Sequence, residues 1–184
     1  YVDLSQDIDR PGAQVRCIST PIVSNDVVVA QVVPAGESGY EATPGHIRGY
    51  DVRTGARLWL FHVVPQGADF AVDTWPEDSW RYTGHAGVWT QLTVDEELGY
   101  LYLPTEIATN DWYGGHRPGD NLFAESIVCL DIRTGELEWH FQNIHHELWD
   151  YNLPPAPGLL TIEKDGQQTS ALDRKSTRLN PSHK

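Results

Sequence analysis

The feature of this sequence that most constrains its fold is a short segment that occurs twice. The first copy is Gly49–Trp59, GYDVRTGARLW, and the second is Cys129–Trp139, CLDIRTGELEW. Asp51 in the first copy corresponds to Asp131 in the second, 80 positions later. In each copy a polar turn separates two apolar-rich runs, and glycine supplies the positive φ that a tight hairpin turn requires. Each copy therefore predicts a β-hairpin with a tryptophan on its second strand.

Strand-like segments surround both hairpins in two sets of four, near residues 17–63 and 88–142. The expected strands are 18–23, 27–33, 47–52 and 57–63, then 88–94, 100–105, 126–131 and 137–142. A ninth, 158–162, opens a third set, and no segment has a helical period. Four-stranded units that repeat, and that cannot bury their faces alone, are typical of propeller blades. The sequence therefore predicts an all-β fold, a β-propeller.

Two complete blades are too few to close a ring, since propellers typically have about four to eight. We therefore expect residues 1–172 to be a partial propeller domain from a longer protein. Residues 173–184, DRKSTRLNPSHK, are basic and polar and break from the acidic body of the chain. They are interpreted as a disordered tail or, preferably, as translated adapter read-through, and they are left out of the fold.

Composition excludes some partners. The net charge of −13 repels phosphate backbones, so nucleic acid is not expected as a partner. No stretch approaches the roughly 20 apolar residues of a membrane span, so membrane association is expected only through segments outside this sequence. Cys17 and Cys129 have neither metal-binding nor redox spacing.

Trp59 and Trp139 allow two roles, stacking on a ligand or packing between blades. A residue that recurs at the same offset in both copies is more often a packing wedge between blades. Large aromatic side chains also dominate the energetics of protein cores. We therefore expect both tryptophans to be largely buried in equivalent positions.

Two long inserts, 65–87 and 108–125, are rich in Trp, Gly, Pro and Asp, which indicates functional loops. Trp89 follows the first insert and is expected at the head of a strand, as the floor of a site for a flat ligand. In the second insert, Gly114 and Gly115 permit close backbone approach. Arg117 either pairs with a carboxylate of a substrate or cofactor, or lies on the surface as most arginines do.

The segment 143–152, NIHHELWDYN, is the densest polar and aromatic cluster. His145 and His146 suggest a metal site, but adjacent residues on a strand point to opposite faces and do not converge on one ion. Asp150 is the better candidate, as a general base. An indole wall from Trp149 would exclude water and raise the pKa of the carboxyl towards a useful range. The alternative is an aspartate that only caps a turn.

Three motifs together resemble the pyrroloquinoline-quinone (PQQ)-dependent dehydrogenases, nearest the quinoprotein glucose dehydrogenases. They are GHIRGYDVRTG at 45–55, WYGG at 112–115 and HHELWDYNLP at 145–154. The similarity extends from about Cys17 to about Ile162. The resemblance implies an eight-bladed propeller, a periplasmic location, and PQQ held near the central axis with a calcium or magnesium ion.

The same resemblance assigns roles to individual residues. It implies that Asp150 is the catalytic base, which takes the hydroxyl proton as hydride passes to the quinone. Trp89 falls on the tryptophan that stacks on the cofactor. Thr109 falls on a cofactor-contacting threonine, with Asn110 in place of the proline that follows it in the family.

Other family positions are not matched. The metal-binding Asp-Asn pair falls on Gly36-Glu37, so the metal ligands are left unassigned. The cofactor-contacting lysine should follow the opening strands of the third blade, where residues 173–184 stand instead. The adjacent Cys-Cys disulfide of the alcohol dehydrogenases is absent from this sequence, which favours the sugar or polyol branch.

We therefore expect part of a dehydrogenase that oxidises a sugar or alcohol hydroxyl and passes electrons to a quinone-type acceptor. The chain alone is expected to be inactive, with unpaired strand edges that favour association. The alternative is a propeller of the same repeat type that serves as a scaffold or binding protein, without a cofactor. A scaffold has no need of the cluster around Asp150 between its blades.

Overall fold

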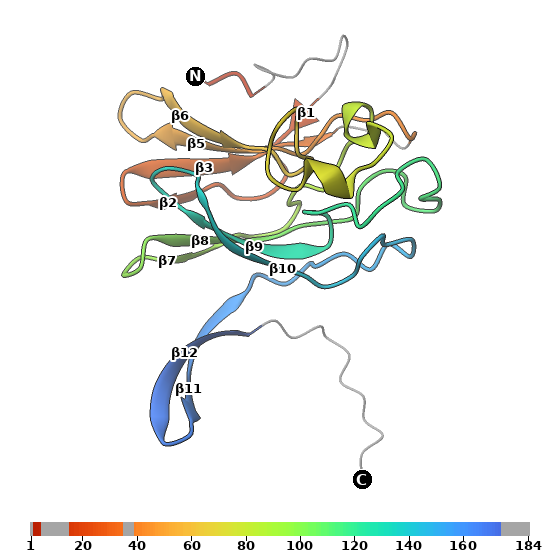
Figure 1. The fold of residues 1–184 in the computed structure, drawn as a ribbon. Coiled ribbons are helices and arrows are strands. Elements are labelled where there is room, and N and C mark those ends of the chain that lie inside the picture. The colour runs from red at the N-terminus through yellow and green to blue at the C-terminus, as the bar shows by residue number, and fades with distance from the viewer. Residues whose placement is uncertain (1, 5–14, 35–38, 174–184) are drawn as a thin grey trace.

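The structure, a computed structural model, describes residues 2–4, 15–34 and 39–173. Two four-stranded antiparallel sheets lie one above the other, and a separate two-stranded hairpin extends beyond the second sheet (Figure 1). The described residues contain no α-helix, only two 3₁₀ turns, Val72–Thr74 and Ser79–Arg81. Among the described residues, no helix is long and apolar enough to cross a membrane.

Both sheets are meanders whose strands pair in chain order. The first contains β2 (Ile22–Ser24), β3 (Val27–Gln31), β5 (Ile47–Asp51) and β6 (Arg57–Phe61). The second contains β7 (Thr93–Asp95), β8 (Tyr100–Pro104), β9 (Ser126–Asp131) and β10 (Leu137–Gln142). The hairpin pairs β11 (Gly158–Lys164) with β12 (Gln167–Asp173), and β1 (Val15–Arg16) pairs with β4 (Val33–Pro34). The two predicted meanders and the start of a third are confirmed.

One strand starts later than the sequence predicts. The segment 88–94 was expected to be a strand, but β7 begins only at Thr93. Within residues 88–92, the Thr90 carbonyl accepts hydrogen bonds from the side chains of Ser19 and Gln31, at 2.5 and 3.2 Å, rather than from a neighbouring strand. Trp89 therefore lies in an irregular segment before β7 rather than at the head of a strand.

The repeated motif folds into the same turn twice. One carboxylate oxygen of Asp51 accepts the amides of Arg53 and Thr54, at 3.0 and 2.7 Å. Asp131 does the same for its own turn, at 2.7 and 3.0 Å. The next glycines, Gly55 and Gly135, have φ of 72° and 73°, the left-handed region that glycine tolerates best. The sequence motif therefore encodes the turn locally, without help from the rest of the chain.

Trp59 joins the two sheets. It is 7% exposed, and its indole N–H donates to the Ile132 carbonyl at 2.9 Å. Its ring lies against Gly135 of the second hairpin, where an added Cβ would be 2.6 Å from the ring. The core between the sheets forms around it, from residues that include Val27, Val29, Ile47, Leu101, Leu103, Val128 and Leu130. Trp59 is the packing wedge that the repeat predicted.

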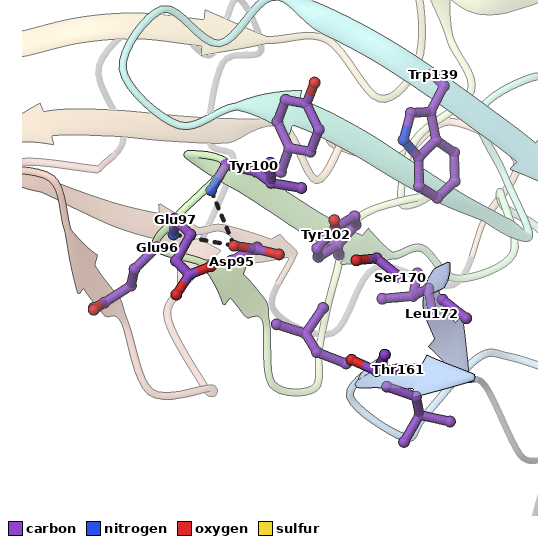
Figure 2. Close-up of a pocket in the computed structure, with 13 residues that line it drawn as sticks. Asp95, Glu96, Glu97, Tyr100, Tyr102, Trp139, Thr161, Ser170 and Leu172 are labelled. Carbon is purple, nitrogen blue, oxygen red and sulfur yellow. Dashed lines mark hydrogen bonds between the residues drawn. The ribbon is translucent and has the colours of Figure 1, made fainter. Parts of the chain in front are cut away.

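Trp139 does not have the predicted burial. It is 38% exposed, and its ring centroid lies 5.9 Å from that of Tyr102. Both side chains line a groove of about 580 Å³ between the second sheet and the hairpin β11–β12 (Figure 2). The expectation that both tryptophans are buried was wrong for Trp139, because no described hairpin packs on it as residues 131–135 pack on Trp59.

Candidate active site

Three segments that are far apart in the sequence lie side by side next to the sheets. The Gly45 amide donates to the His85 carbonyl at 2.8 Å, and the Thr109 amide donates to the Gly84 carbonyl at 3.1 Å. An added Cβ on Gly45 would lie only 2.6 Å from the Cα of Gly87, so the close approach requires glycine there. The loops 42–45, 84–87 and 106–109 are thus tied into one layer, at the end where the long inserts gather (Figure 1).

The segment between β10 and β11 joins this layer. The side-chain oxygen of Asn152 accepts the Ile107 amide at 3.1 Å, and the Thr90 hydroxyl donates to the Pro154 carbonyl. The predicted close approach at the Gly114-Gly115 pair is also present, since an added Cβ on Gly114 would overlap Leu148. The loop that carries Asp150 is therefore held against the loop that carries Thr109.

Asp150 sits at a constrained position in this loop. Its φ is 52°, and its backbone amide donates to Glu147 Oε2 at 3.0 Å. Its Oδ1 accepts a hydrogen bond from the side-chain nitrogen Nδ2 of Asn152 at 2.6 Å. Burial raises the pKa of the Asp150 carboxyl, and the carboxylates of Asp111 and Glu147 raise it further, while the bond from Asn152 lowers it. The direction agrees with the prediction for a general base.

The expected cause of this shift is not what the structure shows. Trp149 was expected to wall off Asp150, but its side chain is 78% exposed, so it does not enclose the carboxyl. The surrounding loops and the neighbouring carboxylates raise the pKa instead.

Glu106 is a site residue that the sequence analysis missed. It is 8% exposed, two residues after the end of β8, and its carboxylate accepts the Gly87 amide. Burial raises the pKa of Glu106 to about 8, and Asp111, Glu125 and Asp150 add to the rise. Among the described residues none donates a hydrogen bond to its Oε1, and His85 Nδ1 is 3.9 Å away. A charged residue within the apolar run from Tyr100 to Ala108 was the signal available in the sequence.

The two residues expected to contact a cofactor differ in accessibility. Trp89 is 37% exposed and leaves part of its ring open. Thr109 is 1% exposed, and its hydroxyl already accepts the Gly84 amide at 3.0 Å. Thr109 belongs to the layer of loops 42–45, 84–87 and 106–109, and Trp89 follows its second member in the chain. Among the described residues, no hydrogen bond joins Trp89 or Thr109 to Asp150.

Arg117 and the histidine pair have structural partners. Arg117 is completely buried, so the surface alternative was wrong, and all three of its nitrogens donate to protein oxygens. His146 Nδ1 lies 3.0 Å from the Gly119 carbonyl, whereas His145 Nδ1 lies 3.4 Å from Asp120 Oδ2. The described part of the chain contains no cluster of three metal-ligating side chains. Gly36-Glu37 lies outside the described residues.

Comparison with known proteins identifies the family. Residues 1–177 match the PQQ family profile described as glucose/ethanol/alcohol dehydrogenase, beta-propeller domain. The chain belongs to this family.

The quinoprotein glucose dehydrogenase of Escherichia coli strain K12 is 35% identical over 156 residues, which are 84% of this chain and 19% of that protein. The glycerol dehydrogenase large subunit of Gluconobacter oxydans is 33% identical and covers 95% of this chain and 25% of its own length. The crystal structure of the quinohemoprotein alcohol dehydrogenase of Comamonas testosteroni superposes with a TM-score of 0.73 at 28% identity. It covers 88% of this chain and 26% of its own. The chain thus spans about a fifth to a quarter of these relatives.

The loop end of this PQQ-family propeller fits the group that the family implies. Exposed aromatic side chains concentrate in its loops: Tyr40, Trp89, Trp112, Tyr113, Trp149 and Tyr151. Open aromatic faces near a few fixed polar groups suit a flat, polar ligand such as a quinone. Glu106 Oε1 is buried and accepts no hydrogen bond from the described residues, and it is an oxygen ligand of the kind that a hard divalent cation prefers.

Proposed function

We propose that this chain is part of a periplasmic PQQ-dependent dehydrogenase that oxidises a sugar or alcohol hydroxyl and passes electrons to a quinone-type acceptor. One observation carries the proposal: Asp150, whose carboxyl has a raised pKa, is held by hydrogen bonds at the aromatic-rich loop end, within electrostatic range of the buried Glu106. A scaffold propeller has no need to accumulate carboxylates there. Keeping carboxyl groups with raised pKa values near one another costs stability, and functional sites are where such costs are retained.

Asp150 has the role of general base. PQQ, when bound, supplies the two-electron acceptor of the reaction. A hydroxyl group becomes a carbonyl only when it loses both its O–H proton and the hydride on the adjacent carbon. Asp150 Oδ2, the oxygen that Asn152 does not occupy, accepts that proton. The raised pKa makes the carboxylate a stronger base than an ordinary aspartate.

Trp89 and Thr109 would hold the cofactor, and Glu106 would hold the cation. Trp89 offers an open ring face for stacking, and Thr109 fixes the neighbouring loop. Glu106 supplies an oxygen for calcium or magnesium, and a cation there would favour the ionised form of a carboxyl that burial otherwise keeps protonated. The names of the relatives, glucose and glycerol dehydrogenases among them, favour a sugar or polyol as substrate.

The decisive experiment is Asp150→Asn in the longer protein to which we propose this chain belongs. Asparagine keeps the shape but cannot accept a proton, so kcat should fall by at least about 10²-fold, roughly 2.7 kcal/mol of activation free energy. PQQ affinity, measured by titration of the apoprotein, should stay unchanged. Asp120→Asn is the matched control, because Asp120 is exposed at the same end and pairs only loosely with His145.

Three other outcomes would change the assignment. Near-parental turnover of the loaded Asp150→Asn protein would exclude this residue as the base. Loss of PQQ affinity that excess calcium restores would instead make Asp150 a cation ligand. Failure of the parental protein to bind PQQ at all would favour the scaffold alternative.

A further inference from the structure

Asp150 is held by a closed chain of hydrogen bonds that starts and ends on one short segment. The Thr109 carbonyl accepts Arg117 Nε at 3.1 Å, and Arg117 Nη2 donates to the Glu147 carbonyl at 2.6 Å. The side chain of Glu147 then accepts the Asp150 amide at 3.0 Å. From Asp150 the chain returns through Asn152 to the Ile107 amide.

The Glu147 side chain caps the turn that presents Asp150. Its two carboxylate oxygens accept the amides of Trp149 and Asp150, two and three residues further on. Asp150 has φ of 52°, in the left-handed region that is uncommon for non-glycine residues, although aspartate adopts it more readily than most. Because Glu147 is 2% exposed, no water replaces these two bonds. Without the Glu147 carboxylate, the backbone amides of Trp149 and Asp150 lose the acceptor that holds the turn in this conformation.

Arg117 connects that turn to the segment of the predicted cofactor contact. It is completely buried, and a guanidinium holds three acceptors at fixed angles, which the single nitrogen of lysine does not. Two of its acceptors are the backbone carbonyls of Thr109 and Glu147, and the third is the Asn121 side chain. Arg117 and the bond from the Ile107 amide to Asn152 therefore together set the position of the Asp150 turn relative to Thr109.

We propose that Arg117 and Glu147 are positioning residues that hold Asp150 in register with the cofactor-contacting segment at 107–109. This inference rests on the proposed function, since it assigns a purpose to the placement of its base. Neither residue touches the reacting atoms. Their effect is geometric, and a displacement of about 1 Å in a catalytic group costs up to about 10²-fold in rate.

The test is a double-mutant cycle in the longer, PQQ-loaded protein. Glu147→Gln and Arg117→Lys should each lower kcat by about 10- to 100-fold, with KM and PQQ affinity changed by less than about two-fold. In the Asp150→Asn background the same changes should lower kcat by less than about two-fold, because a positioning residue has no further effect once its base is gone. Arg117→Lys decides the matter if Glu147→Gln does not fold.

Gln142→Ala is the matched control. Gln142 donates to the carbonyls of Asp120 and Ala124, at 2.7 and 3.2 Å, so it braces the same loop while its side chain makes no hydrogen bond to Arg117, Glu147 or Asp150. Its removal should lower the melting temperature and leave kcat unchanged. Parental kcat in folded Glu147→Gln and Arg117→Lys proteins, or equal losses with and without Asp150, would overturn the proposal. Parental kcat in Asp150→Asn alone would instead overturn the proposed function.

Discussion

The two copies of the hairpin place their tryptophans in different surroundings. Trp59 is 7% exposed and donates to a carbonyl of the second hairpin, whereas Trp139 is 38% exposed and lines an open groove. The turns that precede them have the same hydrogen bonds and nearly the same glycine φ. The difference therefore does not come from the motif itself. It comes from what lies next to each tryptophan. The hairpin of the second sheet packs on Trp59, whereas Trp139 faces an open groove beside β11–β12.

The strands beside each tryptophan differ as well. Opposite Trp59 is Gly49, whose missing side chain lets the indole lie on the backbone. Opposite Trp139 is Cys129, and beyond it Tyr102 stands where the first sheet has Val29. The second sheet thus fills the equivalent row with side chains of its own. A repeated motif fixes the local turn, while the rows that pack on it are free to differ between blades.

The largest expected effect is that of removing the docked tryptophan. In the 184-residue chain, Trp59→Ala should lower the free energy of unfolding by about 3–5 kcal/mol, the range for buried aromatic truncations. Trp139→Ala should cost about 1–2 kcal/mol, because it removes less buried area. In the longer protein the two costs should converge, since a complete third blade would cover Trp139. Urea unfolding measures both, and equal costs in the short chain would contradict the comparison.

A smaller difference is expected between the two turn glycines. Gly55→Ala forces a left-handed conformation on alanine, at about 1–2 kcal/mol. Among the described residues, only Val2 lies within reach of the new Cβ, at 3.4 Å. Gly135→Ala carries the same penalty and also places Cβ 2.6 Å from the Trp59 ring, which adds about 1–3 kcal/mol. Thermal unfolding of both variants isolates the tryptophan contact. Equal losses of stability in the two variants would show that the Trp59 ring moves away from the new Cβ without an energetic penalty.

The smallest effect should appear at alkaline pH. Burial raises the pKa of Tyr102 to about 12, with Cys129 and Asp95 adding to the rise. The folded protein therefore keeps a proton that the unfolded chain releases from its ordinary pKa of about 10, so stability falls as pH rises from about 10 to about 12. Tyr102→Phe should flatten this part of the pH profile of urea unfolding. Val29, at the equivalent place in the first sheet, has no titratable group. If the dependence of stability on pH is unchanged in Tyr102→Phe, Tyr102 is not the group that causes it.

The loop end was only partly predictable. Asp150 stood out because carboxylate, histidine and tryptophan cluster in NIHHELWDYN, and its raised pKa has the predicted direction. The assumed cause, Trp149, is largely exposed to solvent instead. Glu106 and the partners of Arg117 were not found, because their roles depend on contacts across tens of residues, such as the bond between Arg117 and the Glu147 carbonyl. No local pattern marks such contacts.

The sequence by itself determined the strands, their meander order and the hairpin turns. These depend on alternating apolar residues, on an aspartate that binds the next amides, and on glycine at positive φ, all within a few residues of one another. Only the tertiary structure decided which tryptophan is buried, where Trp89 lies, and which carboxyls lose water. Burial and pKa are properties of surroundings that assemble from distant segments, so the loops around Asp150 acquire their chemistry only when the blades stack.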